Sequence, residues 1–169
     1  MTEMTRRALL AAAAALAALP AWAREAIEIG WADLVPPGEG GLAMRTLRSM
    51  GIISHGELNT PWTQQTEAQL TDAYDGKRVR LPGFIVPIEF DGTGVTAFLL
   101  VPYVGACIHV PPPPPNQLVF VTMANEPYQS SGLFEAVWVT GLFGAAAAET
   151  TLAEVGYALE ADAIEPYTG

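Results

Sequence analysis

The residues best suited to chemistry in this chain are Cys107 and His109, which stand two positions apart. Cys107 is the only cysteine and His109 one of two histidines. If residues 107–109 are extended, both side chains point to the same side, with Cβ atoms roughly 6.5–7 Å apart. Zinc bonds of about 2.3 Å to sulfur and about 2.0 Å to nitrogen would let both bind one ion. The spacing therefore predicts two ligands of a metal site.

A thiolate beside an imidazole favours zinc first and copper(I) second over calcium or magnesium, because the hard cations prefer oxygen ligands. Two ligands do not complete a site, so the others must come from elsewhere in the fold. Glu89 is a third candidate ligand. Asp91, His55 and, for copper, Met123 are further ones. The spacing does not choose among them, and no organic cofactor is predicted.

The same pair allows two other interpretations. An imidazole can lower the pKa of a neighbouring thiol and create a nucleophile, with Asn116 or Gln117 orienting the ring. Cys107 and His109 would then be catalytic, in a thiol-dependent enzyme or redox protein. A single cysteine rules out disulfide exchange within one chain. Alternatively, Cys107 is a small buried hydrophobe and His109 a hydrogen-bonded residue at the rim of the core.

Five prolines, residues 111–115, follow directly after Val110. A polyproline II rod rises about 3.1 Å per residue and loses little entropy on folding. Such a rod can bind aromatic grooves, which would make the chain a protein-interaction module. We favour the interpretation that the prolines form a rigid segment, which fixes His109 relative to Asn116 and Gln117.

Residues 1–23 have the pattern of an export signal. Arg6 and Arg7 precede an alanine and leucine run, and Ala21-Trp22-Ala23 resembles a cleavage site. The apolar run is shorter than the about 20 residues of a membrane span. The arginine pair resembles a twin-arginine signal, and the general secretory route is the alternative. We expect a periplasmic mature protein without a transmembrane segment.

The charge of the chain excludes one class of partner. The formal net charge is −10 at pH 7, and no lysine or arginine follows Arg80. Nucleic acid binding needs clustered cations, so we expect no nucleic acid partner.

The rest of the chain predicts an arm followed by a β-domain. Residues 24–75 form the arm, with a short helix over 42–50 and a better helix over 63–74, capped by Thr63. Residues 76–169 form the second part, where apolar residues recur with a period of two. The expected strands cover residues 77–90, 95–104, 117–123, 134–143 and 155–161. A helical turn is expected near 145–148.

The inward set of apolar residues switches parity at Pro82-Gly83 in the first strand, from Val79 and Leu81 to Phe84 and Val86. A bulge or sharp bend produces such a switch. One long bent strand and four more, without crossover helices, predict a small five-stranded antiparallel barrel like the oligonucleotide/oligosaccharide-binding (OB) fold, with a β-sandwich as the alternative. The absence of cations argues against the usual function of that barrel.

Two stretches resemble a known family. They are Pro-Gly-Phe-Ile-Val-Pro-Ile-Glu at 82–89 and Gly-Ala-Cys-Ile-His-Val-Pro-Pro at 105–112, the latter followed by further prolines and Asn116-Gln117. Together they resemble the bacterial exported proteins called domain of unknown function 3299, over about residues 29–145. The family is uncharacterised, and its members tend to be encoded near transport systems, some concerned with zinc.

The resemblance favours the metal interpretation. The expected function is that of an accessory protein, not an enzyme, that binds zinc or copper(I) and serves an envelope transport or metal-homeostasis system. Its expected partners are envelope transport components or another periplasmic protein.

Overall fold

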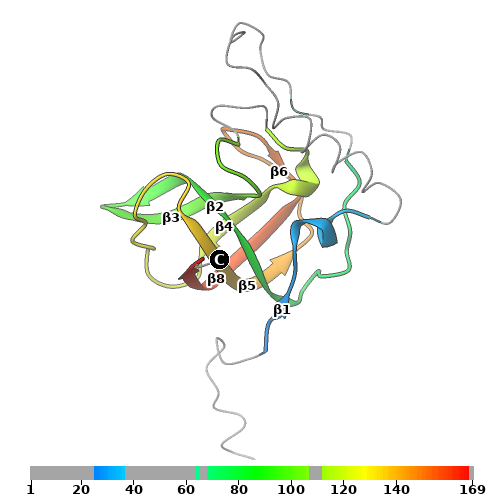
Figure 1. Ribbon diagram of the computed structural model, residues 1–169, viewed down its shortest axis with the longest axis horizontal. Helices are drawn as coiled ribbons and strands as arrows, with labels where there is room; N and C mark the ends of the chain where they lie inside the picture. The colour runs from blue at the N-terminus through cyan, green and yellow to red at the C-terminus, as the bar shows by residue number, and fades with distance from the viewer. Residues whose placement is uncertain (1–24, 37–63, 65–67, 107–111, 168–169) are drawn as a thin grey trace, which may run out of the picture.

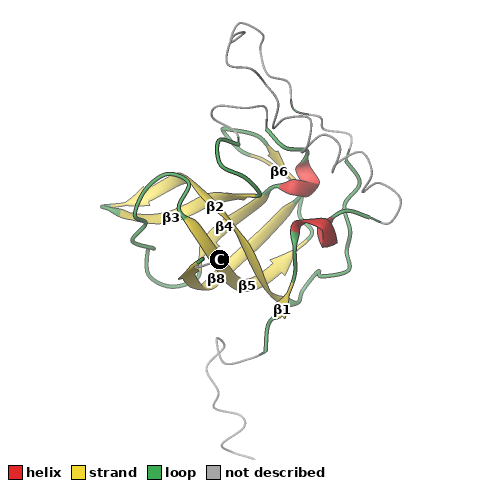
Figure 2. Cartoon of the chain, in the orientation of Figure 1, coloured by secondary structure: helices red, strands yellow, loops and turns green. Residues whose placement is uncertain are grey.

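The computed structural model describes residues 25–36, 64, 68–106 and 112–167. Among these residues strands dominate, and the only helices are two short 3-10 helices (Figure 2). The elements in chain order are β1 (Ile27–Glu28), η2 (Trp31–Leu34), β2 (Arg78–Asp91), β3 (Gly94–Val101), η3 (Pro115–Gln117), β4 (Val119–Met123), β5 (Ala136–Gly144), β6 (Ala148–Glu149), β7 (Glu154–Val155) and β8 (Tyr157–Pro166).

Five strands close into a barrel (Figure 1). Their order is β2-β3-β4-β8-β5, and β5 pairs again with β2. The expected OB-like barrel is therefore confirmed, and one closed sheet replaces the alternative of two packed sheets. The barrel is mixed instead of purely antiparallel, because β8 lies parallel to β4 and antiparallel to β5. The chain enters β8 from the end at which β4 begins, which makes this pair parallel.

β2 is the long bent strand, and it changes partner at Phe84, which pairs with both Ala136 of β5 and Val101 of β3. The predicted parity switch is wrong. Val79, Leu81 and Ile85 all belong to the interior core, so the inward parity continues through Gly83. A side chain at Gly83 would collide with Leu100, with Cβ only 2.7 Å from Cγ. The register shifts occur later, between Pro87 and Phe90.

The misleading pattern arises because the sheet is apolar on both faces. Val86 lies in a second buried cluster outside the barrel, against which Phe84 and Ile88 pack. Residues from the loops complete this outer cluster; its buried members are Val86, Leu99, Val101, Ala106, Leu118, Ala153 and Val155. Alternation therefore indicates the strand but not which face is inside.

The described parts of the arm pack onto the barrel, and their only helix is the 3-10 helix η2. Leu34 is fully buried in the interior core, and Leu70 packs against it. The helix predicted over 63–74 is wrong for its described part, because residues 68–72 are not helical. Their backbone is held by the barrel instead: the Thr71 N–H donates to the Tyr157 hydroxyl at 2.8 Å. The helix predicted over 42–50 lies outside the described residues.

The helical turn expected near 145–148 is also wrong, since residues 145–147 are irregular and β6 begins at Ala148. The backbone N–H of Ala145 donates to the Asp75 carboxylate at 2.9 Å, which takes the chain away from a helical path. In the described part of the chain, no helix is long and apolar enough to cross a membrane.

Candidate functional site

Cys107 and His109 lie outside the described residues, as does His55. The chain on either side of 107–111 is described, and it is anchored. Ala106 is fully buried in the outer cluster. On the other side, Pro113 and Pro115 are buried. The predicted pair therefore belongs to residues 107–111, which lie between the buried Ala106 and the segment that contains the buried Pro113 and Pro115.

The remaining predicted ligands are spread over the fold. Glu89 is exposed in β2 at the register shift opposite Ala97. Asp91 is exposed at the end of the same strand. Met123 ends β4 and packs against the interior core. Among the described residues, no three histidine, cysteine, aspartate or glutamate side chains come close enough to hold a metal ion.

The two amides after the proline run are buried, with Asn116 2% and Gln117 1% exposed. Gln117 donates from Nε2 to two backbone carbonyls, those of Trp31 and Asn116, both at 2.8 Å. Asn116 donates from Nδ2 to the Gln69 carbonyl at 3.2 Å. Its Oδ1 is buried without a hydrogen-bond partner in the described structure. The amide donors are thus used to hold the arm.

Trp31 extends this connection to β2. Its indole Nε1–H donates to the Pro82 carbonyl at 2.7 Å. Together with the bond from Gln117 to the Trp31 carbonyl, this links η3, the arm and the bend of β2. Sequence reasoning grouped Asn116 and Gln117 with the histidine, because no local pattern shows that their partners lie 47 and 86 positions away.

The described prolines are partly embedded. The Pro113 carbonyl accepts from Gln64 Nε2 at 2.9 Å. The Pro115 carbonyl accepts from the Gly156 N–H at 2.8 Å. Pro114 is extended, with φ −60° and ψ 156°, but Pro115 begins η3. The extended segment therefore ends one proline earlier than the sequence suggested. The Pro113 carbonyl is tied to the arm through Gln64, and the Pro115 carbonyl to the residue before β8.

The face that OB folds use for ligands is covered here. OB folds bind oligonucleotides and oligosaccharides on the face of their second and third strands, which correspond to β3 and β4. Leu99 and Val101 on β3 lie in the outer cluster, beneath Ala106, Leu118 and Val155. Because the chain's own loops bury this surface, the barrel does not present it to a ligand.

A hydrogen-bonded carboxylate that the sequence did not single out organises residues 124–135. Glu135 accepts from the Tyr128 hydroxyl at 2.9 Å, the Ser130 hydroxyl at 2.8 Å and the Ser131 N–H at 2.7 Å. Burial raises the pKa of Glu135, but these hydrogen bonds outweigh it and hold the pKa below the ordinary value of 4.5. Burial, and then the bond to Glu135, raise the pKa of Tyr128 to about 12.

The described cations are used in the fold. Arg78 forms a 2.7 Å ion pair with Asp162. Arg80 bridges Glu28 and Glu165, each at 3.1 Å, and its guanidinium carbon lies 4.2 Å from the centre of the Trp138 ring. These contacts connect β1, β2, β5 and β8 on one side of the barrel. They leave no cluster of unpaired arginines that would suit an anionic ligand.

The chain is similar to proteins of one family. A family model described as protein of unknown function (DUF3299) matches residues 31–166. The chain belongs to the DUF3299 family. It is similar to the crystal structure of a DUF3299 family protein from Pseudomonas aeruginosa PAO1, with 38% identity and a TM-score of 0.68. The match covers 86% of this chain and 98% of that one. No curated protein matches this DUF3299 chain.

Proposed function

We propose that this DUF3299 protein is an exported accessory protein that binds a transition metal through Cys107 and His109, zinc first and copper(I) second. It would serve an envelope transport or metal-homeostasis system in the periplasm. Thiolate and imidazole are the ligand types that these metals prefer. Glu89 stays a candidate third ligand. The tendency of family members to be encoded near transport systems, some concerned with zinc, supports the assignment by association.

The observation that carries the proposal is the anchoring of both sides of the Cys-Ile-His segment. Ala106 is 0% exposed, and Asn116 and Gln117, just after the prolines, are 2% and 1% exposed. A metal site gains affinity when its ligands are held in place before binding, since less conformational entropy is then lost.

Asn116 adds a second supporting feature. Its Oδ1 is an unused buried acceptor in the described structure, seven positions after His109. A metal-bound histidine usually donates its other ring N–H to a carbonyl or carboxylate oxygen. Oδ1 of Asn116 is chemically suited to that role. The Gln117 amide is not available as a donor to the ring, because it already binds two carbonyls.

The embedding of the prolines weakens the interaction-module alternative. A polyproline ligand presents its rings and carbonyls to an aromatic groove. Here Pro113 and Pro115 are buried, and both carbonyls already accept hydrogen bonds within the chain. The thiol-enzyme alternative stays open, and it predicts that Cys107 of metal-free protein reacts with iodoacetamide at pH 6.

Metal analysis tests the proposal. Protein purified from the periplasm without added chelator is expected to carry zinc or copper. Cys107→Ala and His109→Ala should each weaken zinc binding at least tenfold in competition with a chromophoric chelator, because each removes one ligand. Asp72→Ala, at an exposed residue of the arm, serves as the control and should retain it. Equal and negligible metal in wild type and Cys107→Ala would overturn the proposal. A Glu89→Gln variant tests the third ligand separately.

A further inference from the structure

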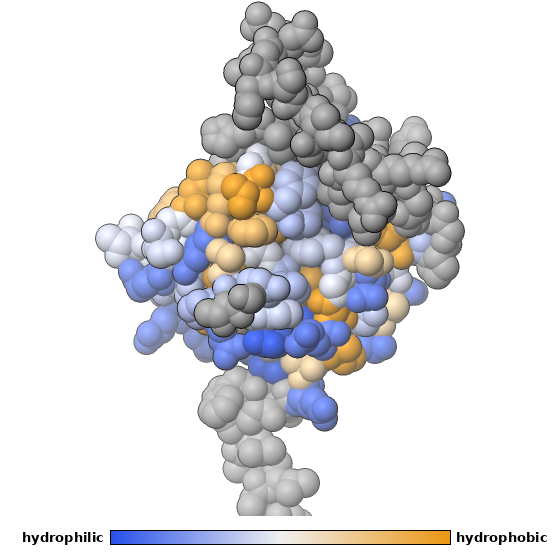
Figure 3. All heavy atoms as spheres, in the orientation of Figure 1, coloured by the Kyte–Doolittle hydropathy of each residue, from blue (hydrophilic) through white to orange (hydrophobic). Residues whose placement is uncertain are grey.

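The end of the β2–β3 hairpin exposes large apolar side chains. Phe90 is 61% exposed and Leu133, in the neighbouring loop, 51%. Figure 3 shows hydrophobic surface gathered over the hairpin and this loop, at the upper left of the view. Exposed apolar side chains that gather in this way mark interaction sites more often than isolated ones do.

Between the hairpin and the loop lies a hollow of about 350 Å³. Its lining residues are Pro87, Phe90, Thr93, Val95, Ser130, Gly132 and Leu133. The loop is fixed at both edges of the hairpin. Val95 and Tyr128 exchange backbone hydrogen bonds of 2.8 and 2.9 Å on the β3 side. On the β2 side the Phe134 N–H donates to the Ile85 carbonyl at 2.8 Å. The hollow is therefore preformed, which lowers the entropy cost of binding.

The hairpin is unsuited to strand addition. β5 pairs with β2 only as far as Phe84, so in the described structure the outer edge of residues 87–91 has no strand beside it. Pro87 removes a backbone donor from that edge, and the register shifts between Pro87 and Phe90 distort it. Prolines and bulges of this kind block edge-to-edge pairing. Recognition here must therefore use side chains in the hollow.

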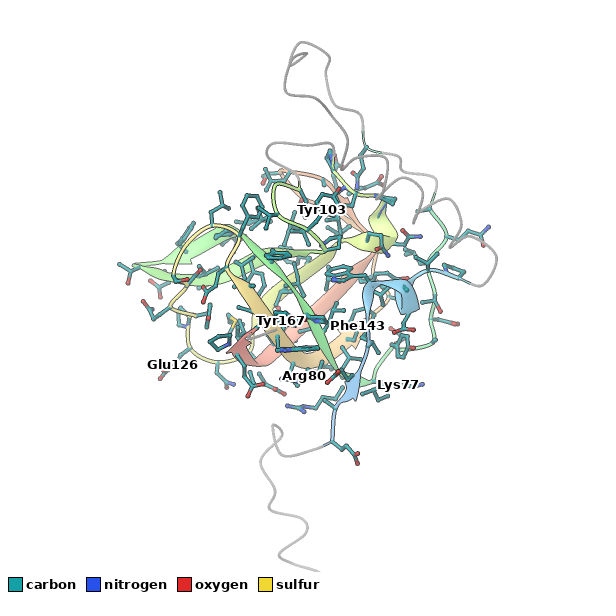
Figure 4. The ribbon with its side chains drawn as sticks, viewed as in Figure 1. Lys77, Arg80, Tyr103, Glu126, Phe143 and Tyr167 are labelled. Carbon is teal, nitrogen blue, oxygen red and sulfur yellow. The ribbon has the colours of Figure 1, made fainter. Side chains whose placement is uncertain are left out.

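The surroundings of the hollow are acidic. Glu89 and Asp91 are exposed on either side of Phe90, which lines the hollow, and their carboxylates form its rim. Within residues 25–36, 64, 68–106 and 112–167 the only cations are Lys77, Arg78 and Arg80, at the start of β2. From Arg80 to Phe90 is roughly 30 Å along the strand. Figure 4 shows Lys77 and Arg80 away from the hairpin end. A partner therefore meets an apolar hollow with a negative rim.

We infer that this hollow is a docking site for a cationic amphipathic segment of a partner protein, with a bulky apolar side chain in the hollow and lysine or arginine beside it. Opposite charges at the rim speed association and select partners. A second copy of this chain would bring the same acidic rim and be repelled, as would an anionic membrane. The site lies at the opposite end of β3 from the proline run. Glu89 is the one residue that it shares with the metal proposal, and the variants that test the hollow leave Glu89 unchanged.

Peptide binding tests the inference with three fluorescent probes of equal length and spacing. One alternates leucine with lysine, one leucine with glutamate and one serine with lysine. The leucine–lysine peptide should bind at least tenfold more tightly than either of the others. Phe90→Ser combined with Leu133→Ser should weaken its binding at least tenfold. Leu142→Ser is the matched control, because Leu142 is 52% exposed on β5. It should leave binding unchanged.

Three results would overturn the inference. The first is equal weakening by the Leu142→Ser control and the double variant, because this would show non-specific binding. The second is an NMR titration with the leucine–lysine peptide in which the amide chemical-shift changes lie away from residues 87–95 and 128–134. The third is a wild-type dimer in sedimentation that the double variant dissociates, since the occupant would then be a second copy. Asp91→Lys should weaken binding at low salt, and less so at 0.5 M salt, where charges are screened.

Discussion

At the end of the barrel where the proline run lies, neutral amides hold the loops, whereas at the hairpin end a carboxylate holds them. Gln117 and Trp31 each donate from a side chain to distant backbone carbonyls, at 2.8 and 2.7 Å. Glu135 instead accepts three hydrogen bonds from its own loop. The first set joins segments far apart in sequence, and the second shapes one loop.

This difference indicates at which end of the barrel stability depends on pH. Amide and indole groups do not titrate in the ordinary range, so the connections near the prolines are constant. Glu135 has a lowered pKa, so its contribution to stability is present above the unfolded value of 4.5 and is lost as the pH falls through the folded value. Acid should therefore loosen the hairpin end while leaving the hydrogen bonds of Gln117 and Trp31 intact.

The largest effect is expected for Gln117→Leu, which keeps the volume of the side chain but removes both hydrogen bonds. It leaves two carbonyls without their donor, and we expect a loss of about 2–3 kcal/mol in the free energy of unfolding. Urea denaturation measures it. The loss should be the same at pH 4 and pH 7, and a clear dependence on pH would contradict the comparison.

Gln129→Leu is the matched control for this variant. Gln129 is exposed at the hairpin end, and its Oε1 accepts a hydrogen bond from the Thr93 hydroxyl at 3.2 Å. Because exposed hydrogen bonds are exchanged for water on unfolding, we expect a change below about 0.5 kcal/mol.

A smaller effect is expected for Trp31→Phe. Phenylalanine keeps an aromatic ring but cannot donate to the Pro82 carbonyl, and it fills less volume. We expect a loss of about 1–2 kcal/mol. Hydrogen exchange checks the location of the effect, since residues 68–72 and the bend of β2 should exchange faster while residues 128–135 keep their protection. Faster exchange throughout the barrel would show that Trp31 does not act locally.

The smallest effect is expected for Glu135→Gln. The new amide N–H groups would face the donors of Ser130 and Ser131, so one charge-assisted hydrogen bond is lost. We expect a loss of about 1 kcal/mol in the free energy of unfolding at pH 7. The difference from wild type should be full above about pH 5.5 and should shrink as the pH falls below the ordinary carboxyl range. Urea curves across this range measure it. A difference that grows in acid would mean that Glu135 is not stabilised as the anion.

The sequence predicted the barrel because alternation and turn residues are local signals. Gly92 and Thr93 form the turn that joins β2 and β3, between the strands expected over 77–90 and 95–104. The face of each strand could not be predicted, because loops distant in sequence bury the outer residues as well. The helix over 63–74 was wrongly predicted for a related reason. The Thr71 N–H donates to Tyr157 of β8 and the Gln69 carbonyl accepts from Asn116 of η3, and such contacts override helical propensity.

The candidate site was predicted from residue type and short-range spacing. Cys107 and His109 carry their chemistry in their side chains, so two letters of sequence are enough to nominate them. The roles of Trp31, Asn116 and Gln117 could not be predicted, because each depends on a partner brought close only by the closed barrel. Glu135 was missed because a single glutamate in a loop has no distinguishing pattern.

The position of β8 has a consequence for how the chain reaches this state. β8 is the last strand in sequence, yet it lies between β4 and β5 and pairs with both. During synthesis, β2, β3, β4 and β5 emerge first, and until residues 157–166 follow they carry two open edges. Open edges pair readily with other chains. The nascent chain therefore depends on residues 157–166 for protection from aggregation, and stopping synthesis before Tyr157 leaves a sheet that cannot close.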